Sequence, residues 1–334
     1  MEREREVTTI QLFATMLGIP FSPWAYDHSK AMGKKGKKAQ AGKPKKLTPK
    51  DISKRLDVLV KKLEEENKGA DLFAPLPPTE DCAICLVPLP HVQSKIVYKA
   101  CCGNRICKAC HFENDASIDK QNEENGGKKL AFSCPFCREP VPKSDPEVRR
   151  HLHAACLRND HIAITQMGNH YWDGLHEAPQ DDLKALDCWI RAVELGSFDA
   201  CTNIGNGYNE GKGVAINEGR TALFYRVGAL RGSIGARHKI GLSDYESGNH
   251  EIAIRHWKIA AEAGYQPSLD QLKKIYNADG KMPGKDFISK AYLESNYRAG
   301  PESQMEIKNE EREKHRNDGV DEALQRMLKA LSAD

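Results

Sequence analysis

Apolar residues recur at helical spacing between residues 158 and 300, and this pattern itself repeats along the chain. The segment QMGNHYWDG (166–174) is echoed by NIGNGYNEG (203–211) and by KIGLSDYESG (239–248). The matching glycines Gly168, Gly205 and Gly241 lie 37 and 36 residues apart. A period in the middle thirties with two helical patterns per unit predicts a stack of helical hairpins, because one hairpin cannot bury its apolar face alone.

Small and aromatic residues recur at matching positions of these units. We expect Gly168 and Gly205 to let paired helices approach closely. A weaker fourth unit follows the third and extends the pattern to residue 300. The recurring aromatic residues are interpreted as the core of the stack, so no ligand-binding residue is assigned there: Tyr171, Trp172, Trp189, Tyr208, Tyr225 and Trp257.

The repeated glycine, tyrosine and alanine positions resemble the Sel-like repeats of the tetratricopeptide superfamily. The residues that carry the resemblance are Gly168, Tyr171, Gly174, Gly205, Tyr208, Gly211, Gly213, Val214, Ala222, Tyr225, Ala229, Gly232 and Ala236. The resemblance implies an α-helical solenoid over residues 143–300. It also implies a curved surface that binds a protein substrate or partner.

A separate amphipathic helix is predicted over residues 48–69. Its apolar residues Ile52, Leu56, Leu59 and Leu63 fall on one helical face at heptad-like spacing. This face either packs on a neighbouring domain or supports self-association, and about two heptads are too few for a coiled-coil assignment. A proline-rich linker is expected to follow over residues 70–81.

The two ends of the chain differ in composition from the rest. The formal net charge is +3, but residues 33–50 hold eight lysines and no acid, which leaves −5 for the remainder. Residues 1–47 are therefore interpreted as a short N-terminal segment and a disordered lysine-rich stretch, which fits a nuclear-import signal or a solvated linker. The lysines lack interleaved aromatic residues, so nucleic-acid binding is not expected. A charged tail with a capping helix is predicted over 301–334.

Cysteines are concentrated in the remaining segment, where eight of the eleven lie between residues 82 and 137. The start of the sequence does not read as a secretory signal and no apolar run is long enough to span a membrane, so a reducing cytoplasmic or nuclear location is expected. There, clustered cysteines bind metal more often than they form disulfides. Three C-x2-C pairs and two further thiols predict two structural zinc ions. The eight ligands are Cys82, Cys85, Cys101, Cys102, Cys107, Cys110, Cys134 and Cys137.

The segments CAICLVPL and CPFCREPVP resemble those of a RING finger, which would span residues 82–142. The family's interleaved ligand order implies that one zinc is held by the first pair and Cys107 and Cys110, and the other by Cys101, Cys102 and the last pair. The usual family histidine is absent, because Asn104 occupies its position. Cys101 is the expected replacement, with His111 and His91 as rivals. The segment 120–129 is expected to be a surface loop.

The resemblance implies a mostly α-helical ubiquitin-protein ligase, with a small zinc-stabilised cross-brace module followed by the helical repeats. The module would recruit a ubiquitin-conjugating enzyme through Ile84, Pro135 and Arg138. It would act by positioning, so no catalytic residue is assigned. The alternative is a non-enzymatic zinc-binding scaffold. No phosphate loop, nucleophile triad or paired-carboxylate motif stands out.

Overall fold

The structure is a computed structural model that describes residues 47–124, 132–278 and 281–298. The chain divides into a unit of residues 1–48, of which only 47 and 48 are described, and a unit of residues 49–334. Residues 1–46, which hold most of the predicted lysine-rich stretch, and the predicted capping helix of the tail lie outside the described residues. No helix in the described ranges is long and apolar enough to cross a membrane.

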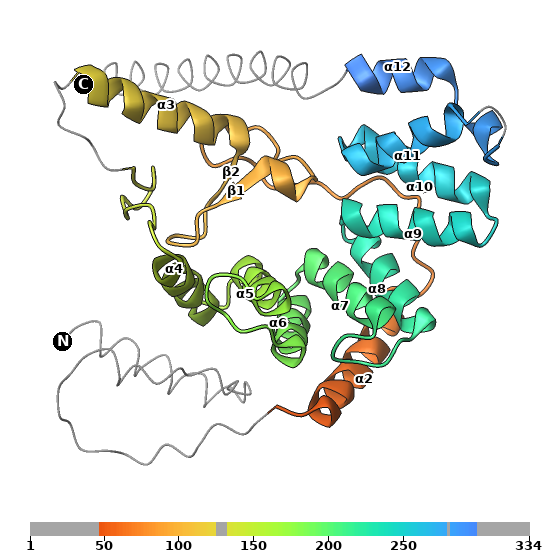
Figure 1. The fold of residues 1–334 in the computed structure, drawn as a ribbon, viewed down its shortest axis with the longest axis horizontal. Coiled ribbons are helices and arrows are strands. Elements are labelled where there is room, and N and C mark those ends of the chain that lie inside the picture. The colour runs from red at the N-terminus through yellow and green to blue at the C-terminus, as the bar shows by residue number, and fades with distance from the viewer. Residues whose placement is uncertain (1–46, 125–131, 279–280, 299–334) are drawn as a thin grey trace, which may run out of the picture. The chain divides into compact units, whose positions relative to one another are not determined.

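The described part of the second unit is mostly helical, and Figure 1 shows the order of its elements. A long helix comes first, a small strand pair with one attached helix follows, and a series of packed helices completes the unit. The elements are α2 (Pro49–Glu66), η2 (Gln93–Lys95), β1 (Ile96–Tyr98), β2 (Arg105–Cys107), α3 (Lys108–Glu124), α4 (Asp145–Leu157), α5 (His161–Asp173), α6 (Asp182–Glu194), α7 (Phe198–Glu210), α8 (Glu218–Leu230), α9 (Ile234–Glu246), α10 (His250–Glu262), α11 (Gln266–Tyr276), η3 (Lys285–Phe287) and α12 (Lys290–Arg298).

The predicted helical hairpins are present: α5 packs on α6, α7 on α8 and α9 on α10. Each hairpin also contacts the next one, through α6 with α7, α8 with α9 and α10 with α11. The first helix of each hairpin begins at a side-chain cap, because Asp160, Ser197 and Ser233 accept hydrogen bonds from main-chain N–H groups of the first turn. The hairpin stack predicted from the period is therefore confirmed by the packing itself.

A glycine of each first helix faces an aromatic side chain of the paired second helix. A Cβ atom at Gly205 would lie 2.6 Å from Cδ1 of Tyr225, and one at Gly241 would lie 2.5 Å from Nε1 of Trp257. Gly168 faces Trp189 in the same way. The sequence-based interpretation of the aromatic residues as stack core is confirmed for five of the six, since all but the half-buried Trp172 are buried.

A ladder of polar pairs links adjacent hairpins, which the sequence analysis did not predict. In each rung, a polar side chain of one first helix bonds to a serine at or near the start of the next first helix. The rungs are Thr165 Oγ1 with Ser197 Oγ, Thr202 Oγ1 with Ser233 Oγ, and His238 Nδ1 with Ser268 Oγ, each at 2.9 Å. The buried hydroxyl groups of these serines thus have hydrogen-bond partners, and the ladder links successive repeats without leaving them unsatisfied.

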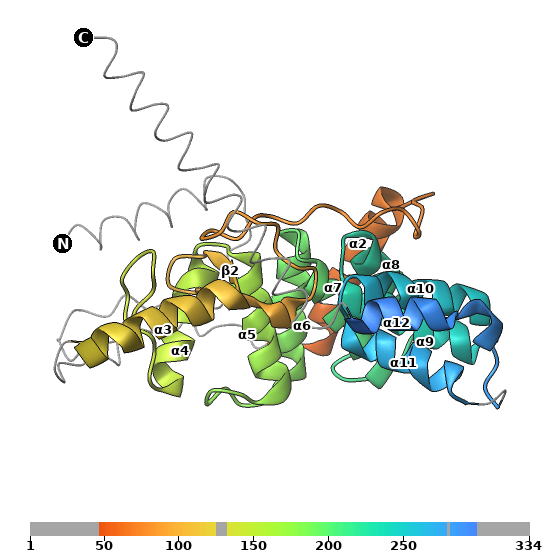
Figure 2. The ribbon, with the colours of Figure 1, turned by 90° about the horizontal axis from the view of Figure 1, so that it is seen from above.

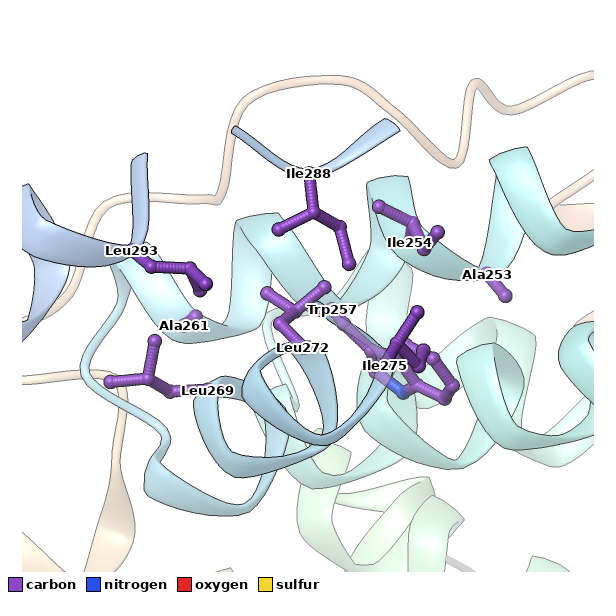
Figure 3. Close-up of a cluster of buried hydrophobic side chains, with 9 residues drawn as sticks. All are labelled: Ala253, Ile254, Trp257, Ala261, Leu269, Leu272, Ile275, Ile288 and Leu293. Atoms are coloured by element: carbon purple, nitrogen blue, oxygen red, sulfur yellow. The ribbon is translucent and has the colours of Figure 1, made fainter. Parts of the chain in front are cut away.

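The weak fourth unit packs on the third hairpin. Trp257 of α10 belongs to the apolar core that they share and is fully buried (Figure 3). Leu272 of α11 and Ile288, just after η3, pack against the same cluster, and Leu293 of α12 lies at its edge. The chain after α11 thus buries apolar surface on the third hairpin, as a repeat unit must.

Helix α2 packs on α6 and α8, the second helices of two successive hairpins (Figure 2). The four predicted apolar residues, Ile52, Leu56, Leu59 and Leu63, are all buried. Ion pairs flank this face, including Arg220 to Asp57 at 2.5 Å, Arg231 to Glu66 at 3.1 Å, and Arg55 to Asp187. The face is covered by the same chain, so in this arrangement it is not available for the alternative of self-association.

Residues 70–81, here called the strap, run from α2 to the cysteine module and are fastened to the repeats. Arg237, which is 2% exposed, donates from Nη1 to the Leu72 carbonyl at 2.8 Å. The ring of Phe73 stacks on His256 with centroids 4.6 Å apart, and the Arg255 guanidinium lies 3.9 Å from the Phe73 centroid. The segment predicted as a linker is thus tied to α9 and α10 by specific contacts.

Candidate metal centres

The eight predicted cysteines lie in two groups of four within the described residues. In the first group, the sulfur atoms of Cys82, Cys85, Cys107 and Cys110 all lie within 4.8 Å of one another. In the second, the same holds for Cys101, Cys102, Cys134 and Cys137. Cys101 and Cys102 lie between the first two C-x2-C pairs in the sequence but belong to the other group, which is the interleaved arrangement that the RING resemblance implies.

One C-x2-C turn of each group, at residues 82–85 and 134–137, has the same local geometry. In the first turn, the Cys82 N–H donates to Val87 O at 2.8 Å and the Leu86 N–H donates to Cys82 O at 2.9 Å. Leu86, directly after the second cysteine, has a φ of +57°. Isolated bridges between Asp81 and Pro88 and between Ser133 and Pro140 close the two turns.

The second turn repeats this pattern with different residues. The Cys134 N–H donates to Glu139 O at 2.8 Å and the Arg138 N–H donates to Cys134 O at 3.0 Å. Arg138 has a φ of +61°, in the left-handed region that non-glycine residues adopt at a cost. Both turns have a residue with positive φ at the same position, as expected of turns that hold two thiol ligands in a fixed geometry.

The adjacent cysteines Cys101 and Cys102 are accommodated by a tight turn. The N–H groups of Cys102 and Gly103 both donate to the Lys99 carbonyl, at 3.1 and 2.8 Å, and Gly103 has a φ of +83°. Asn104 donates from Nδ2 to the Cys102 sulfur at 3.3 Å. Asn104, at the position where the RING resemblance implies a histidine, therefore donates a hydrogen bond to one of the thiols.

The two rival histidines lie elsewhere. His91 Nε2 lies 2.9 Å from the Pro77 carbonyl, and His111 Nδ1 lies 3.5 Å from the Asp115 carboxylate. Neither belongs to a group of four metal-ligating side chains in the described part of the chain.

The donor chemistry and spacing fit a tetrahedral zinc ion. Four thiolates at about 2.3 Å from zinc have sulfur–sulfur edges of roughly 3.8 Å. The Cys102 and Cys134 sulfur atoms are 3.7 Å apart. Such thiols share protons: hydrogen bonds from Cys110, Cys82 and Cys85 lower the pKa of Cys107, and the hydrogen bond to Cys107 raises the pKa of Cys110.

The second group also contains a thiol whose pKa is lowered. Burial opposes the ionisation of Cys134, but main-chain N–H groups of Cys137 and Phe136 and the neighbouring thiols lower its pKa to about 7. Zinc binds cysteine as the thiolate, so thiols with a lowered pKa in each group suit a metal site.

The two groups differ in burial. Three of the four cysteines of the first group are buried, and they pack with the fully buried Ile106 and with Leu89. In the second group, only Cys134 is buried and Cys137 is exposed. The first centre therefore includes a small apolar core, whereas the second depends more on its ligands.

The module is attached to the start of the repeats. Tyr98 donates its hydroxyl proton to Asp160 at 2.5 Å, and Arg158 donates to the Ala100 carbonyl at 2.9 Å. Asp160 also caps α5 through the N–H groups of Ile162 and Ala163. One carboxylate thus serves both the first repeat helix and the loop that carries Cys101 and Cys102.

The expected partner-binding residues all lie in the two C-x2-C turns. Ile84 is 42% exposed, Arg138 is exposed and Pro135 is half-buried. Two exposed apolar side chains that the sequence analysis did not select, Leu86 and Phe112, are 62% and 56% exposed. The module therefore exposes apolar side chains at its first turn and on α3.

No family model matches the chain, and no curated protein does. Several solved structures are similar to it, among them the following two. One is c5321, a protective antigen of uropathogenic Escherichia coli strains with an SLR fold, at 22% identity and a TM-score of 0.39, covering 59% of this chain and 39% of that chain. The other is a Sel1 repeat protein from Oxalobacter formigenes, at 24% identity and a TM-score of 0.35, covering 41% of this chain and 58% of that chain. The match thus spans less than two thirds of either structure.

Proposed function

We propose that the protein is a RING-type ubiquitin ligase that binds two structural zinc ions and presents a protein partner on Sel-like repeats. The observation that carries the proposal is the interleaving of the cysteines: the first two C-x2-C pairs share one group of four, although Cys101 and Cys102, which lie between them in the sequence, belong to the other. Interleaving ties two short turns into one rigid body. A segment with few large buried side chains could then keep a fixed docking surface.

The proposed chemistry is positioning. Zinc in a closed four-thiolate site carries no reactive water, so the ions would supply folding free energy and no nucleophile. A module that holds a conjugating enzyme near an acceptor lysine would convert a bimolecular aminolysis into an effectively intramolecular one. Ile84 would contact the conjugating enzyme through its exposed aliphatic chain, and Arg138 would bridge the enzyme and ubiquitin.

The attachment of the module supports a joint role of its surface and the repeats. Hydrogen bonds fix the Cys101–Cys102 loop to Asp160 and Arg158, and the strap is fastened to Arg237. A ligand on the repeats would consequently lie at a defined distance from the docked enzyme. That is a requirement for transfer by proximity.

The test is a ubiquitylation assay with activating enzyme, a panel of conjugating enzymes and ubiquitin, with zinc content measured alongside. We expect chains from the wild type and at least a tenfold loss with Ile84→Ala or Arg138→Ala, both with two zincs retained. Ile216→Ala is the matched control, because Ile216 is 68% exposed between α7 and α8. Full activity in both module variants would contradict their roles, and no chains from a zinc-loaded wild type would favour the scaffold alternative.

A further inference from the structure

A cavity of about 380 Å³ lies between the cysteine module and the repeats. One wall is formed by residues 91–94 and Arg105 of the module. The opposite side, here called the floor, is formed by the first helices α5, α7 and α9 with Tyr265 at the start of α11. Its size falls in the range of peptide and small-molecule sites. Because its floor is built from successive repeats, the cavity follows the direction in which the repeats stack.

Two asparagines on this floor form a fixed amide pair. Asn169 Oδ1 accepts hydrogen bonds from Trp189 Nε1 at 3.0 Å and from Asn203 Nδ2 at 2.8 Å. These bonds orient both amides, and both side chains are half-buried in the cavity lining. Among the residues that the structure describes, the Asn169 Nδ2 donor and the Asn203 Oδ1 acceptor have no protein partner.

The donor on one amide and the acceptor on its hydrogen-bonded neighbour could together pair with a main-chain peptide unit. A main-chain peptide unit carries one N–H and one C=O, and both require partners when they are removed from water. Apolar side chains on both walls, including Val92, Phe198 and Ile234, could cover the side chains that flank such a unit. The floor is therefore suited to an extended main chain.

The charge of the cavity gives a preference for the ligand's side chain. Asp199 lies on the floor, and burial raises its pKa to about 6, while nearby Arg105 and a hydrogen bond from Ser233 oppose this shift. Arg105 itself is paired with Glu80 at 2.8 Å. A cation beside Asp199 would offset the cost of burying its ionised form, whereas an anion would increase it.

We propose that this cavity binds an extended polypeptide segment, with one main-chain amide held by Asn169 and Asn203 and a basic side chain paired with Asp199. The inference deepens the proposed function, since it places the bound protein between the module and the repeats. The binding itself needs neither a conjugating enzyme nor ubiquitin. A failed ubiquitylation assay and a failed binding assay would therefore have different meanings.

The test uses the zinc-loaded full chain and a library of acetylated, amidated heptapeptides with mixed flanking residues. The central residue is fixed as lysine, norleucine or glutamate, and affinity is measured by fluorescence polarisation. We expect lysine peptides to bind best and glutamate peptides worst. Loss of a main-chain hydrogen bond in Asn203→Leu is expected to weaken lysine-peptide binding about tenfold. Asn209→Leu is the matched control, because Asn209 is exposed on the same helix and lies outside the cavity.

A second variant, Asp199→Asn, keeps the test decisive if Asn203→Leu fails to fold. Asp199→Asn preserves shape, so we expect it to retain peptide binding but to lose the preference for lysine over norleucine. The proposal is overturned if the wild type binds none of the peptides or prefers glutamate. It is also overturned if a folded Asn203→Leu binds as well as the wild type, or if Asp199→Asn leaves the lysine preference unchanged.

Discussion

The close approach of Gly241 to Trp257 predicts that a single added methyl group destabilises the third hairpin. In Gly241→Ala, the new Cβ would lie 2.5 Å from Nε1, 2.8 Å from Cδ1 and 3.0 Å from Cε2 of the indole. Favourable contacts between such atoms lie near 3.5–4.0 Å. Trp257 is fully buried and donates from Nε1 to the His238 carbonyl at 3.2 Å, so it cannot move aside without losing packing or this hydrogen bond.

The expected magnitude follows from three contributions. Overpacking of a filled core costs about 1–3 kcal/mol. Weakening of the indole hydrogen bond adds about 1 kcal/mol. Replacement of glycine by alanine in a helix returns about 1 kcal/mol. The net expectation is a loss of about 1–3 kcal/mol in the free energy of unfolding of α9 and α10.

The assay is amide hydrogen exchange followed by mass spectrometry, because a repeat stack can open locally without unfolding throughout. Exchange in α9 and α10 should accelerate roughly five- to 150-fold, the factor that corresponds to 1–3 kcal/mol. Gly219→Ala is the matched control. Gly219 is exposed in α8, and an added Cβ would meet only Asn217 Oδ1 at 3.6 Å. That variant should be as stable as the wild type or slightly more stable.

One result would contradict the predicted clash between Gly241→Ala and Trp257. If Gly241→Ala exchanges like Gly219→Ala, the two helices do not approach each other as described. A double variant provides a further check: in a Trp257→Leu background the added methyl group has space, so Gly241→Ala should cost little there.

Three other predictions address the remaining features of the chain. Leu56→Ala should lower the free energy of unfolding of α2 by about 2–5 kcal/mol, since Leu56 is fully buried, whereas Val58→Ala should change it little because Val58 is 65% exposed; exchange over residues 49–66 measures both. Cys101→Ser should bind one zinc per chain by native mass spectrometry while His111→Ala binds two, and one zinc lost from His111→Ala would reverse the ligand assignment. Burial raises the pKa of Asp199 from its ordinary value of about 3.8 to about 6, so between these pH values the unfolded state binds fewer protons than the folded state. The stability of the wild type relative to Asp199→Asn should therefore fall as pH rises through this window. Urea titrations at several pH values measure it, and a constant difference would contradict the prediction.

The spacing of residues in the chain was sufficient to predict the hairpins and to select the cysteines. A hairpin repeat is a local object, so its period, its small residues and its aromatic residues appear together within about 36 residues. The Gly205–Tyr225 contact connects positions only 20 residues apart. A C-x2-C turn is still more local. Regularities of this kind are visible in a linear sequence because the contacts behind them are short-range.

One local prediction was wrong. Residues 120–124 were expected to begin a surface loop, but they form the last part of α3. Composition alone did not indicate a helix that starts at Lys108. The start of α3 is set by the cysteine centre, because Cys107 ends β2 and Cys110 lies in the first turn. An anchored first turn removes much of the nucleation cost, after which the lysine and glutamate residues can continue the helix.

Contacts between distant segments could not be read from the sequence, because no local pattern encodes the partner of a surface. The apolar face of α2 was visible, yet its partner depends on pairs such as Asp57 with Arg220, 163 residues apart. The path of the strap depends on the carbonyl of Leu72 reaching Arg237, 165 residues away. The cavity depends on further long-range contacts, such as that of Tyr98 with Asp160, which hold the cysteine module beside the repeats. The chain's local periodicities thus define its parts, and burial between distant surfaces defines how those parts combine into a site.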